Sequence, residues 1–340
     1  MYNVKLYNKI SKVGLDDLDA AKYTCSEDFT DYDAVLVRSA KLHEVEFSKN
    51  LKCIARAGAG VNNIPVDVCA EKGIVVFNTP GANANAVKEQ VLAAMLLASR
   101  DLIGGNEWVK ANKDDADIAK ATEKAKKAFA GQEIKGKKLG VIGLGAIGQL
   151  VANAAIALGM EVYGYDPYLS VNAAWNLSSE VKYISDVKDI YKECNYITVH
   201  VPATPETKNM INAESLAKCK DGVRLLNFAR GGLVDTEALK AALADGTITE
   251  YITDFPDGEV IELENVICIP HLGASTPESE DNCAEMAAIE LKQYLEYGII
   301  KNSVNFPNCD APYTGKARIA LLHKNVSGMV GAITNILSAD

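Results

Sequence analysis

The sequence lacks any apolar segment long enough to cross a membrane. Its longest run of apolar side chains, Val91–Ala98, is far shorter than the roughly 20 residues that a membrane helix needs. The N-terminus also lacks the apolar stretch of a signal peptide, because Val4 and Leu6 alternate with polar residues as they do in a strand. We therefore expect a cytoplasmic protein with no membrane partner.

The chain also has no excess of positively charged residues. The formal net charge is −10, which argues against a nucleic-acid or anionic-membrane partner. The lysines of residues 110–129 are interleaved with acids and have few aromatic neighbours, so this segment is predicted to be an exposed helix. An anionic substrate would have to be met by a local cluster of cations.

Paired cysteines are absent too. The chain has eight cysteines and no Cys-x-x-Cys pair, and most of them stand among apolar neighbours. This pattern predicts reduced thiols in the core rather than a disulfide framework or a zinc site, and we expect no metal.

What the chain does contain is a repeated alternation of strand-like and helix-like segments over 340 residues, enough for two or more domains. Strands are expected first at Val4–Tyr7, Ala34–Arg38, Cys53–Ala57 and Ile74–Phe77, and later at Val162–Tyr165, Tyr196–Val201, Val223–Asn227, Tyr251–Thr253 and Val266–Ile269. Long helices are expected at Val87–Leu102, Asp235–Ala244 and Asn282–Tyr297, with Asp235 as the N-cap and Gly246 as the stop of the second. The alternation predicts doubly wound parallel sheets.

A glycine-rich loop marks the start of the second set of units. An apolar strand from Lys138 runs into Gly143, Gly145 and Gly148, and an alanine-rich helix follows. Such glycines allow a tight turn, close approach of backbone to a pyrophosphate, and close packing of helix on strand. Asp166 ends the next strand, where a carboxylate accepts hydrogen bonds from a ribose and repels a 2′-phosphate. We therefore predict NAD binding.

Candidates for acid–base chemistry are few, because the chain has only four histidines. His271 directly follows the last strand expected in the second set of units. Arg230, flanked by glycines at the end of another strand, has the planar fork that binds a carboxylate. The segment Asp254–Glu259, which lies between them, carries three acids, and an acid placed beside His271 would raise its pKa. Arg38 and Arg56 end two strands of the first set and are candidates for an anionic group.

Five segments together resemble the D-isomer-specific 2-hydroxyacid dehydrogenases. They are residues 56–63 (RAGAGVNN), 78–81 (NTPG), the Gly143 loop, 227–232 (NFARGG) and 270–276 (PHLGAST). The resemblance spans almost the whole chain. It implies two α/β domains, a Rossmann-type cofactor domain at 99–286 and a flavodoxin-like substrate domain at 1–98 with 287–306.

The resemblance also implies roles for particular residues. Arg230 would hold the substrate carboxylate and carbonyl oxygen, His271 would exchange the hydroxyl proton, and a glutamate would orient His271. The cofactor residues are expected to be Gly143, Gly145, Ala146, Ile147, Gly148, Asp166, His200, Pro202, Ala229, Asp254 and Gly273, with Asp254 at the nicotinamide amide. The substrate residues are expected to be Arg38, Ser39, Lys41, Arg56, Ala57, Gly58, Ala59, Gly60 and Arg230.

Two positions depart from the family pattern. Ala146 stands where an arginine is common, so the pyrophosphate would depend more on helix N–H groups. The segment that carries the family's glutamate reads Asp254-Phe255-Pro256-Asp257-Gly258-Glu259, with the aromatic residue one place early. Glu259 is our candidate for the partner of His271, and Asp257 is the alternative.

The expected reaction is NAD-dependent oxidation of D-3-phosphoglycerate to 3-phosphohydroxypyruvate, the first step of serine biosynthesis. Arg38, Lys41 and Arg56 would bind the phosphate. A relative that reduces glyoxylate or hydroxypyruvate, or one that acts on D-lactate, stays open as an alternative. A third possibility is an NAD-sensing, corepressor-like protein without turnover.

The C-terminal segment, residues 307–340, resembles a linker and an incomplete ACT regulatory module. A strand is expected at Ala317–Leu322, followed by a helix with Val326, Met329, Val330, Ile333 and Leu337 on one face. The resemblance would place His323 and Asn325 against a serine effector, with weak or absent inhibition. The resemblance to the dehydrogenase family also implies a homodimer or homotetramer.

Overall fold

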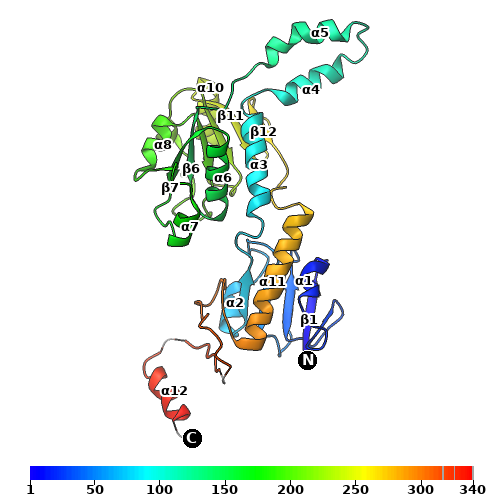
Figure 1. Cartoon of the computed structure of the whole chain (residues 1–340), viewed down its shortest axis with the longest axis vertical. Helices are drawn as coiled ribbons and strands as arrows, with labels where there is room; N and C mark the ends of the chain where they lie inside the picture. Colours follow the sequence, from blue (N-terminus) through cyan, green and yellow to red (C-terminus); the bar gives the residue numbers. More distant parts are fainter. Residues whose placement is uncertain (316–317, 325, 339–340) are drawn as a thin grey trace. The chain divides into compact units, whose positions relative to one another are not determined.

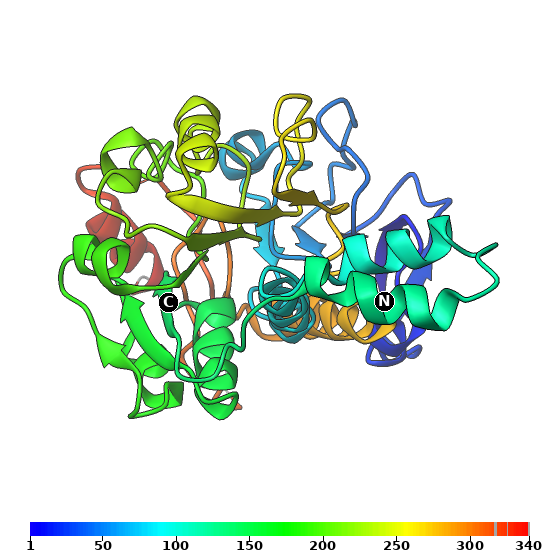
Figure 2. The same cartoon turned by 90° about the horizontal axis from the view of Figure 1, so that it is seen from above.

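The computed structural model describes residues 1–315, 318–324 and 326–338, and the chain divides into two compact units. Unit 1 is formed by Met1–Ala82 with the segment from Glu280 onward, and unit 2 by Asn83–Ser279. Figures 1 and 2 show both units as α/β structures. Among the described residues, no helix combines the length and apolar character needed to cross a membrane.

Unit 1 is built on a five-stranded parallel sheet with the order β2-β1-β3-β4-β5. Its strands are β1 (Tyr2–Tyr7), β2 (Tyr23–Ser26), β3 (Ala34–Val37), β4 (Cys53–Arg56) and β5 (Val75–Asn78), and its helices are α1 (Lys12–Asp16), α2 (Val66–Glu71), α11 (Pro277–Tyr297) and α12 (Met329–Leu337). This is the flavodoxin-like order, so the expected fold of the first domain is confirmed.

Alternate residues of these strands supply two separate cores. Leu36, Ala55 and Phe77 face α11, whose Ala287 and Leu291 pack against them. Val37, Ile54 and Val76 face the opposite side, where they pack with Cys69 of α2. Strands buried on both faces read as continuous apolar runs, which explains why β3 to β5 were found from the sequence.

Unit 2 is built on a seven-stranded parallel sheet with the order β12-β11-β10-β9-β6-β7-β8. Its strands are β6 (Lys138–Ile142), β7 (Glu161–Tyr165), β8 (Lys182–Tyr183), β9 (Tyr196–Val199), β10 (Val223–Asn227), β11 (Ile248–Thr253) and β12 (Val266–Cys268). The order reverses between β6 and β9, as in the Rossmann fold, so the expected fold of the second domain is also confirmed.

Helices cover both faces of this sheet. On one face lie α3 (Ala84–Leu97) and α6 (Ala146–Ala157), which pack on Val141, Val162 and Leu226. On the other face lie α8 (Val187–Glu193), α9 (Ala213–Leu216) and α10 (Thr236–Asp245). The remaining helices of unit 2 are α4 (Leu102–Ala111), α5 (Ile118–Ala125), the 3₁₀ turn η1 (Lys126–Phe129) and α7 (Val171–Asn176).

The unit boundaries differ from those expected at residues 98 and 286. Helix α3 belongs with unit 2, because its buried residues Val87, Val91 and Met95 join the core that contains α6. The first turn of α11, Pro277–Ser279, also belongs to unit 2. The apolar composition of the segment showed that it is buried, but composition alone does not show against which sheet.

The expected helix Val87–Leu102 is interrupted near its end. Ser99 donates a hydrogen bond to the carbonyl oxygen of Met95, and Asp101 caps a new helix by accepting from the N–H of Gly104 at 2.7 Å. The expected helix over residues 110–129 is likewise divided, because α4 ends at Ala111, α5 begins at Ile118, and η1 follows α5 directly. By contrast, α10 has the expected caps, with Asp235 accepting from Ala238 and Gly246 left-handed at φ 81°.

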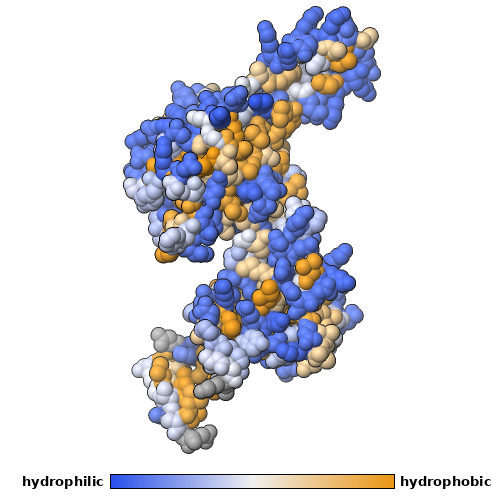
Figure 3. Space-filling view, viewed as in Figure 1, coloured by the Kyte–Doolittle hydropathy of each residue, from blue (hydrophilic) through white to orange (hydrophobic). Residues whose placement is uncertain are grey.

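The C-terminal segment contains α12 but not the strand expected at Ala317–Leu322, of which Ala317 lies outside the described residues. Residues 318–322 form no strand, because no described strand pairs with them. The expected strand is therefore wrong and the expected helix is confirmed. Helix α12 exposes Val330, Ile336 and Leu337. Figure 3 shows hydrophobic surface on this C-terminal segment.

Candidate active site

The glycine-rich loop connects β6 to α6, and a different structural constraint favours glycine at each of its three glycine positions. Gly143 has φ 91°, and a Cβ on it would lie 2.6 Å from the carbonyl oxygen of His200. A Cβ on Gly148 would lie 1.9 Å from the carbonyl oxygen of Gly143. Gly145 has open space around its missing Cβ. The loop therefore turns tightly, packs closely and leaves room on its ligand side, as expected.

The N-terminus of α6 is suited to a pyrophosphate. Gly145 is its N-cap, and no side chain caps the helix, so the N–H groups at Ala146 and Ile147 have no intrahelical acceptor. A helix start with uncapped N–H groups beside an open glycine fits a diphosphate group. These residues therefore fit NAD. Ala146 brings no charge, so the helix itself supplies the attraction.

Asp166 stands directly after β7 and ties the loop to the neighbouring strand. Its Oδ2 accepts the N–H of Leu144 at 2.9 Å, and its Oδ1 accepts the N–H of Tyr168 at 2.8 Å. A carboxylate has further lone pairs, so Asp166 can still accept hydrogen bonds from ribose hydroxyls. Asp166 thus has a second role, in holding the loop, that the sequence did not reveal.

His200 follows β9 across the point where the strand order reverses. Its N–H donates to the carbonyl oxygen of Ile142 at 2.7 Å, and its Nε2 lies 2.9 Å from Oγ1 of Thr198. Burial lowers its pKa to about 4, so the ring is neutral. Pro202 is exposed beyond it, while Ala229, after β10, is buried.

Asp254 follows β11 and is a buried carboxylate with an unsatisfied atom. Only 2% of the residue is exposed, and Oδ1 has no hydrogen-bond partner. Burial raises its pKa to about 6, and nearby Arg230 acts in the opposite direction. Gly273 leaves the space beside it, because a Cβ there would lie 3.7 Å from Oδ2. A buried acceptor without a donor fits the carboxamide of a nicotinamide ring.

His271, Arg230 and Phe255 come together at the carboxyl ends of β10, β11 and β12. The ring centroid of Phe255 lies 4.6 Å from that of His271, with 53° between the planes. Burial lowers the pKa of His271, and the positive charge of Arg230 lowers it further. Arg230 is exposed, and in the described part of the chain its guanidinium donates one hydrogen bond, to the carbonyl oxygen of Ala229, which leaves most of its donors available.

The acids of the expected triad lie elsewhere in this structure. Glu259 accepts from Nζ of Lys240 at 2.8 Å, and Asp257 accepts the N–H groups of Glu259 and Val260. Among the described residues, no carboxylate raises the pKa of His271, which is lowered instead. The expected pairing of an acid with His271 is therefore not formed, because each acid has another donor at hand.

The expected substrate residues of unit 1 meet at the ends of the adjacent strands β3 and β4. Nε of Arg56 donates to the carbonyl oxygen of Arg38 at 3.0 Å, and the guanidinium of Arg38 pairs with Glu280 at 2.7 Å. Lys41 and Ser39 are exposed. The turn Ala57–Gly60 follows directly, with Gly58 at φ 148° and its missing Cβ facing the Arg56 guanidinium.

Two residues that hold these turns were missed. Oδ1 of Asn8, at φ 72° after β1, accepts the N–H groups of Ser39 at 2.9 Å and Ala40 at 2.7 Å. Oγ1 of Thr79 accepts the N–H of Gly58 at 2.8 Å. An asparagine just after a strand is the one signal that pointed to Asn8. Within the described residues, no cluster of three or more His, Cys, Asp or Glu side chains could hold a metal.

The chain matches a known family over the glycine loop and the residues around His271. Residues 92–273 match the family described as D-isomer specific 2-hydroxyacid dehydrogenase, NAD binding domain. A D-3-phosphoglycerate dehydrogenase of Methanocaldococcus jannaschii is 36% identical over 313 residues, covering 89% of this chain and 57% of that protein. The chain thus spans little more than half of that relative.

Two other relatives are matched over most of their own length. A hydroxypyruvate reductase of Thermotoga maritima is 40% identical over 281 residues, covering 78% of this chain and 85% of that protein. A crystal structure of cofactor (NAD+)-bound 3-phosphoglycerate dehydrogenase from Entamoeba histolytica has a TM-score of 0.69 at 26% identity, covering 90% of this chain and 99% of that one.

Proposed function

The chain belongs to the D-isomer specific 2-hydroxyacid dehydrogenases, and within this family we propose that it oxidises D-3-phosphoglycerate to 3-phosphohydroxypyruvate with NAD. One observation carries the choice of substrate. Relatives named D-3-phosphoglycerate dehydrogenase match at 36–39% identity over 80–89% of the chain. The cofactor is NAD, for which the glycine loop, Asp166 and Asp254 provide a fitting set of groups.

His271 is proposed as the general base of the oxidation. A lowered pKa keeps its imidazole neutral at neutral pH, and only the neutral ring can take the C2 hydroxyl proton. NAD, when bound, accepts the hydride that leaves C2. In the reverse direction the protonated ring returns the proton to the oxygen. The low pKa makes that imidazolium a stronger acid.

Arg230 is proposed to bind the substrate carboxylate and the C2 oxygen. Its guanidinium presents several N–H donors in one plane, a geometry suited to two oxygens at once. Its charge also favours neutral His271, so the same side chain positions substrate and tunes the base. We keep Glu259 as the proposed partner of His271 in the reacting complex, with Asp257 as the alternative. This role requires Glu259 to leave Lys240.

The phosphate is assigned to Arg38, Lys41 and Arg56, and the carboxylate is assigned to the turn Ala57–Gly60 together with Arg230. The Arg38–Glu280 pair is two-fifths exposed on both sides, and such pairs contribute only about 0–1 kcal/mol. A phosphate dianion can therefore replace Glu280. Binding of serine and assembly into a dimer or tetramer stay predictions.

The test is a panel in the reducing direction, with NADH and phosphohydroxypyruvate, hydroxypyruvate, glyoxylate or 2-oxoglutarate, ranked by kcat/KM. Phosphohydroxypyruvate should rank first. Arg38→Ala should lower kcat/KM for phosphohydroxypyruvate by about 10-fold or more and hardly change that for hydroxypyruvate. Lys72→Ala, at another exposed cation of unit 1, is the matched control. An equal loss on both substrates would refute the phosphate assignment.

A second candidate is a hydroxypyruvate reductase, favoured by the match to the Thermotoga maritima protein. It predicts that hydroxypyruvate ranks above its phosphorylated form and that Arg38→Ala has no effect. A corepressor-like protein without turnover is the third, and it predicts NADH binding with no oxidation by any 2-oxo acid. The panel separates all three.

A further inference from the structure

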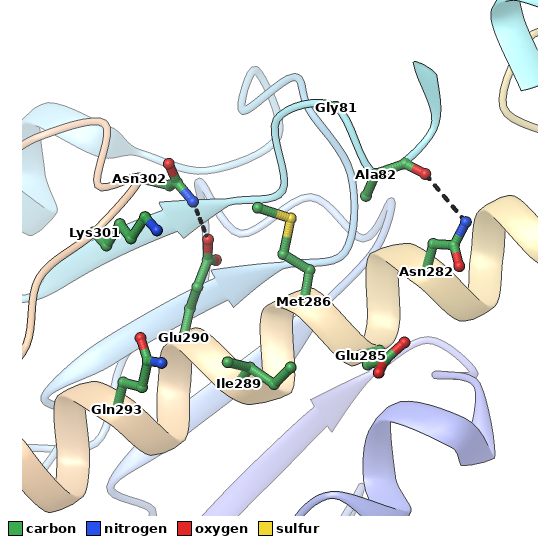
Figure 4. A pocket seen from close by; sticks show the side chains of 10 residues that line it. All are labelled: Gly81, Ala82, Asn282, Glu285, Met286, Ile289, Glu290, Gln293, Lys301 and Asn302. Atoms are coloured by element: carbon green, nitrogen blue, oxygen red, sulfur yellow. Dashed lines mark hydrogen bonds between the residues drawn. The ribbon is translucent and has the colours of Figure 1, made fainter. Parts of the chain in front are cut away.

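Unit 1 contains a pocket of about 400 Å³ that the proposed reaction does not use. It lies along one face of α11, where Met286, Ile289, Glu290 and Gln293 line it, and Ala82 and Lys301 close it from two other segments. Figure 4 shows these side chains gathered along the helix, with the Glu290 carboxyl directed toward Asn302.

Glu290 is the unusual member of this pocket, because it is an acid with only 5% of its surface exposed. Its Oε1 accepts from Nδ2 of Asn302 at 2.7 Å, while Oε2 is buried and has no hydrogen-bond partner among the described residues. Burial raises its pKa to about 8. A buried carboxyl oxygen that lacks a partner is costly and calls for an explanation.

The charged groups of the pocket do not compensate the charge of an ionised Glu290. Lys301 favours the ionised form, yet it makes no ion pair with Glu290 in the part of the chain that the structure describes. Glu285 is the other charged group of the pocket, so the lining carries two acids and one base. The lining between these charges is apolar, with Met286 and Ile289 on the helix, and Ile289 is 38% exposed.

We propose that this pocket binds a small aliphatic ammonium compound, with its nitrogen on the Glu290 carboxylate and its hydrocarbon chain against Met286 and Ile289. An ammonium group donates to the oxygen that has no partner and neutralises the charge that burial opposes. The hydrocarbon chain covers the exposed part of Ile289. A carboxylate ligand would place like charge beside Glu285 and Glu290, and a neutral alcohol would leave the ionised Glu290 without a counter-charge.

Met286 supplies the necessary access. Figure 4 shows its side chain standing beside the Glu290 carboxyl. Methionine is unbranched with three rotatable bonds and adapts readily to a ligand. Rotation of Met286 exposes Oε2 to the bound nitrogen, and the thioether then packs on the hydrocarbon chain. The site lies within unit 1 and does not depend on the proposed reaction.

Binding is coupled to ionisation of Glu290. At pH 6.5 a group with pKa near 8 is protonated, and the ammonium compound binds the ionised form, so close to one proton leaves for each ligand bound. Affinity should increase about 10-fold per pH unit up to pH 8 and then level off. Lys301 and Glu285 are the charged groups that face the site and modulate this dependence.

The test uses calorimetric titration of the full chain with n-butylammonium, n-butyrate and 1-butanol. We expect n-butylammonium to bind at one site with Kd of about 1 mM, and the other two at least about 10-fold more weakly. Titrations at pH 6.5 in two buffers of different ionisation enthalpy measure the proton release. Equal affinity for all three probes, or binding without proton release, would overturn the proposal.

Three variants locate the site. Glu290→Gln, which keeps the size of the side chain, should abolish both binding and proton release. At pH 9, where Glu290 is ionised and the stabilisation of its charge by Lys301 no longer limits binding, Lys301→Met should increase the affinity about 3- to 10-fold, because it removes a positive charge near the ligand nitrogen. Glu278→Gln, on the exposed first turn of the same helix, should change neither quantity. Retention of binding in Glu290→Gln, or weaker binding in Lys301→Met at pH 9, would contradict the assignment.

Discussion

Phe255 lies against His271, with 4.6 Å between ring centroids and 53° between ring planes. The contact removes water from one side of the imidazole, and desolvation is the larger of the two causes that lower the pKa of His271. The charge of Arg230 is the second cause. The base of the proposed oxidation is thus kept neutral by an aromatic ring and a cation.

The first prediction concerns that contact. Phe255→Ser admits water to the ring and should return the pKa of His271 toward its usual value. Because oxidation needs neutral His271, the acid limb of the kcat/KM profile should move to higher pH. Phe255→Leu keeps the site apolar and should shift the limb less. An unmoved acid limb in the serine variant would show that Phe255 does not desolvate the base.

The second prediction concerns Glu259, which pairs with Lys240. If Glu259 turns to His271 in the reacting complex, Glu259→Gln should lower kcat by about 10- to 100-fold with little change in KM. Lys240→Met removes only the competing partner and should leave kcat unchanged or slightly higher. Steady-state kinetics of both variants decide the question, because equal effects would indicate a purely structural ion pair. Asp257→Asn tests the alternative acid in the same assay.

The third prediction concerns Asp254, whose pKa is raised to about 6 by burial. Ionised Asp254 accepts a hydrogen bond from the nicotinamide amide, so NADH affinity should fall as the pH drops through 6. Asp254→Ala should lower the affinity by about 10-fold at pH 7.5 and lose the pH dependence. Fluorescence titration with NADH from pH 5 to 8 measures both. A pH dependence that persists in the alanine variant would assign it to another group.

The fourth prediction separates the two roles of Asp166. Asp166→Asn keeps an oxygen acceptor for the N–H of Leu144 and removes the negative charge. It should therefore preserve the fold and most of the NADH affinity, while the preference for NADH over NADPH falls by about 10-fold or more. Asp166→Ala loses both roles and should also destabilise unit 2. Thermal unfolding together with binding of both cofactors distinguishes these effects.

The fifth prediction concerns the stability effect of Glu290, whose folded-state pKa of about 8 lies above its ordinary 4.5. A raised pKa means that stability is full below about pH 4.5 and is lost as the pH rises through 8. Relative to Glu290→Gln, the wild-type free energy of unfolding should therefore fall by at most roughly 5 kcal/mol over this range. Urea unfolding at intervals of one pH unit measures it. Parallel curves for the two proteins would show that Glu290 is solvated.

Much of the fold could be predicted because buried parallel strands and the glycine loop carry local signals. Apolar runs identified β3 to β5 and β9 to β11, and Asp235 with Gly246 marked the ends of α10. Strands β2 and β8 were missed, because short strands at sheet edges have polar residues and no apolar run. The strand expected at residues 318–322 was wrong although the segment is apolar. A strand also needs a neighbouring strand to pair with, and an apolar pattern does not show whether one is present.

The candidate site likewise has features that the sequence predicted and features that it did not. Gly143, Gly145 and Gly148 have the conformations that their spacing predicts. The contact of Phe255 with His271 and the pairing of Glu259 with Lys240 depend on side-chain directions at the ends of different strands. No spacing along the chain determines these directions, and the sequence accordingly left two acids as alternatives.

The discontinuity of unit 1 has a consequence for biosynthesis. The face of its sheet formed by Leu36, Ala55 and Phe77 is covered by α11, and a Cβ on Gly14 of α1 would lie 2.4 Å from the backbone of Ala284. During synthesis on the ribosome this apolar face therefore stays uncovered until all of unit 2 has been made, because α11 is translated after it. Unit 2 can complete its core first, and the nascent N-terminal segment is the part that chaperones would need to shield from aggregation.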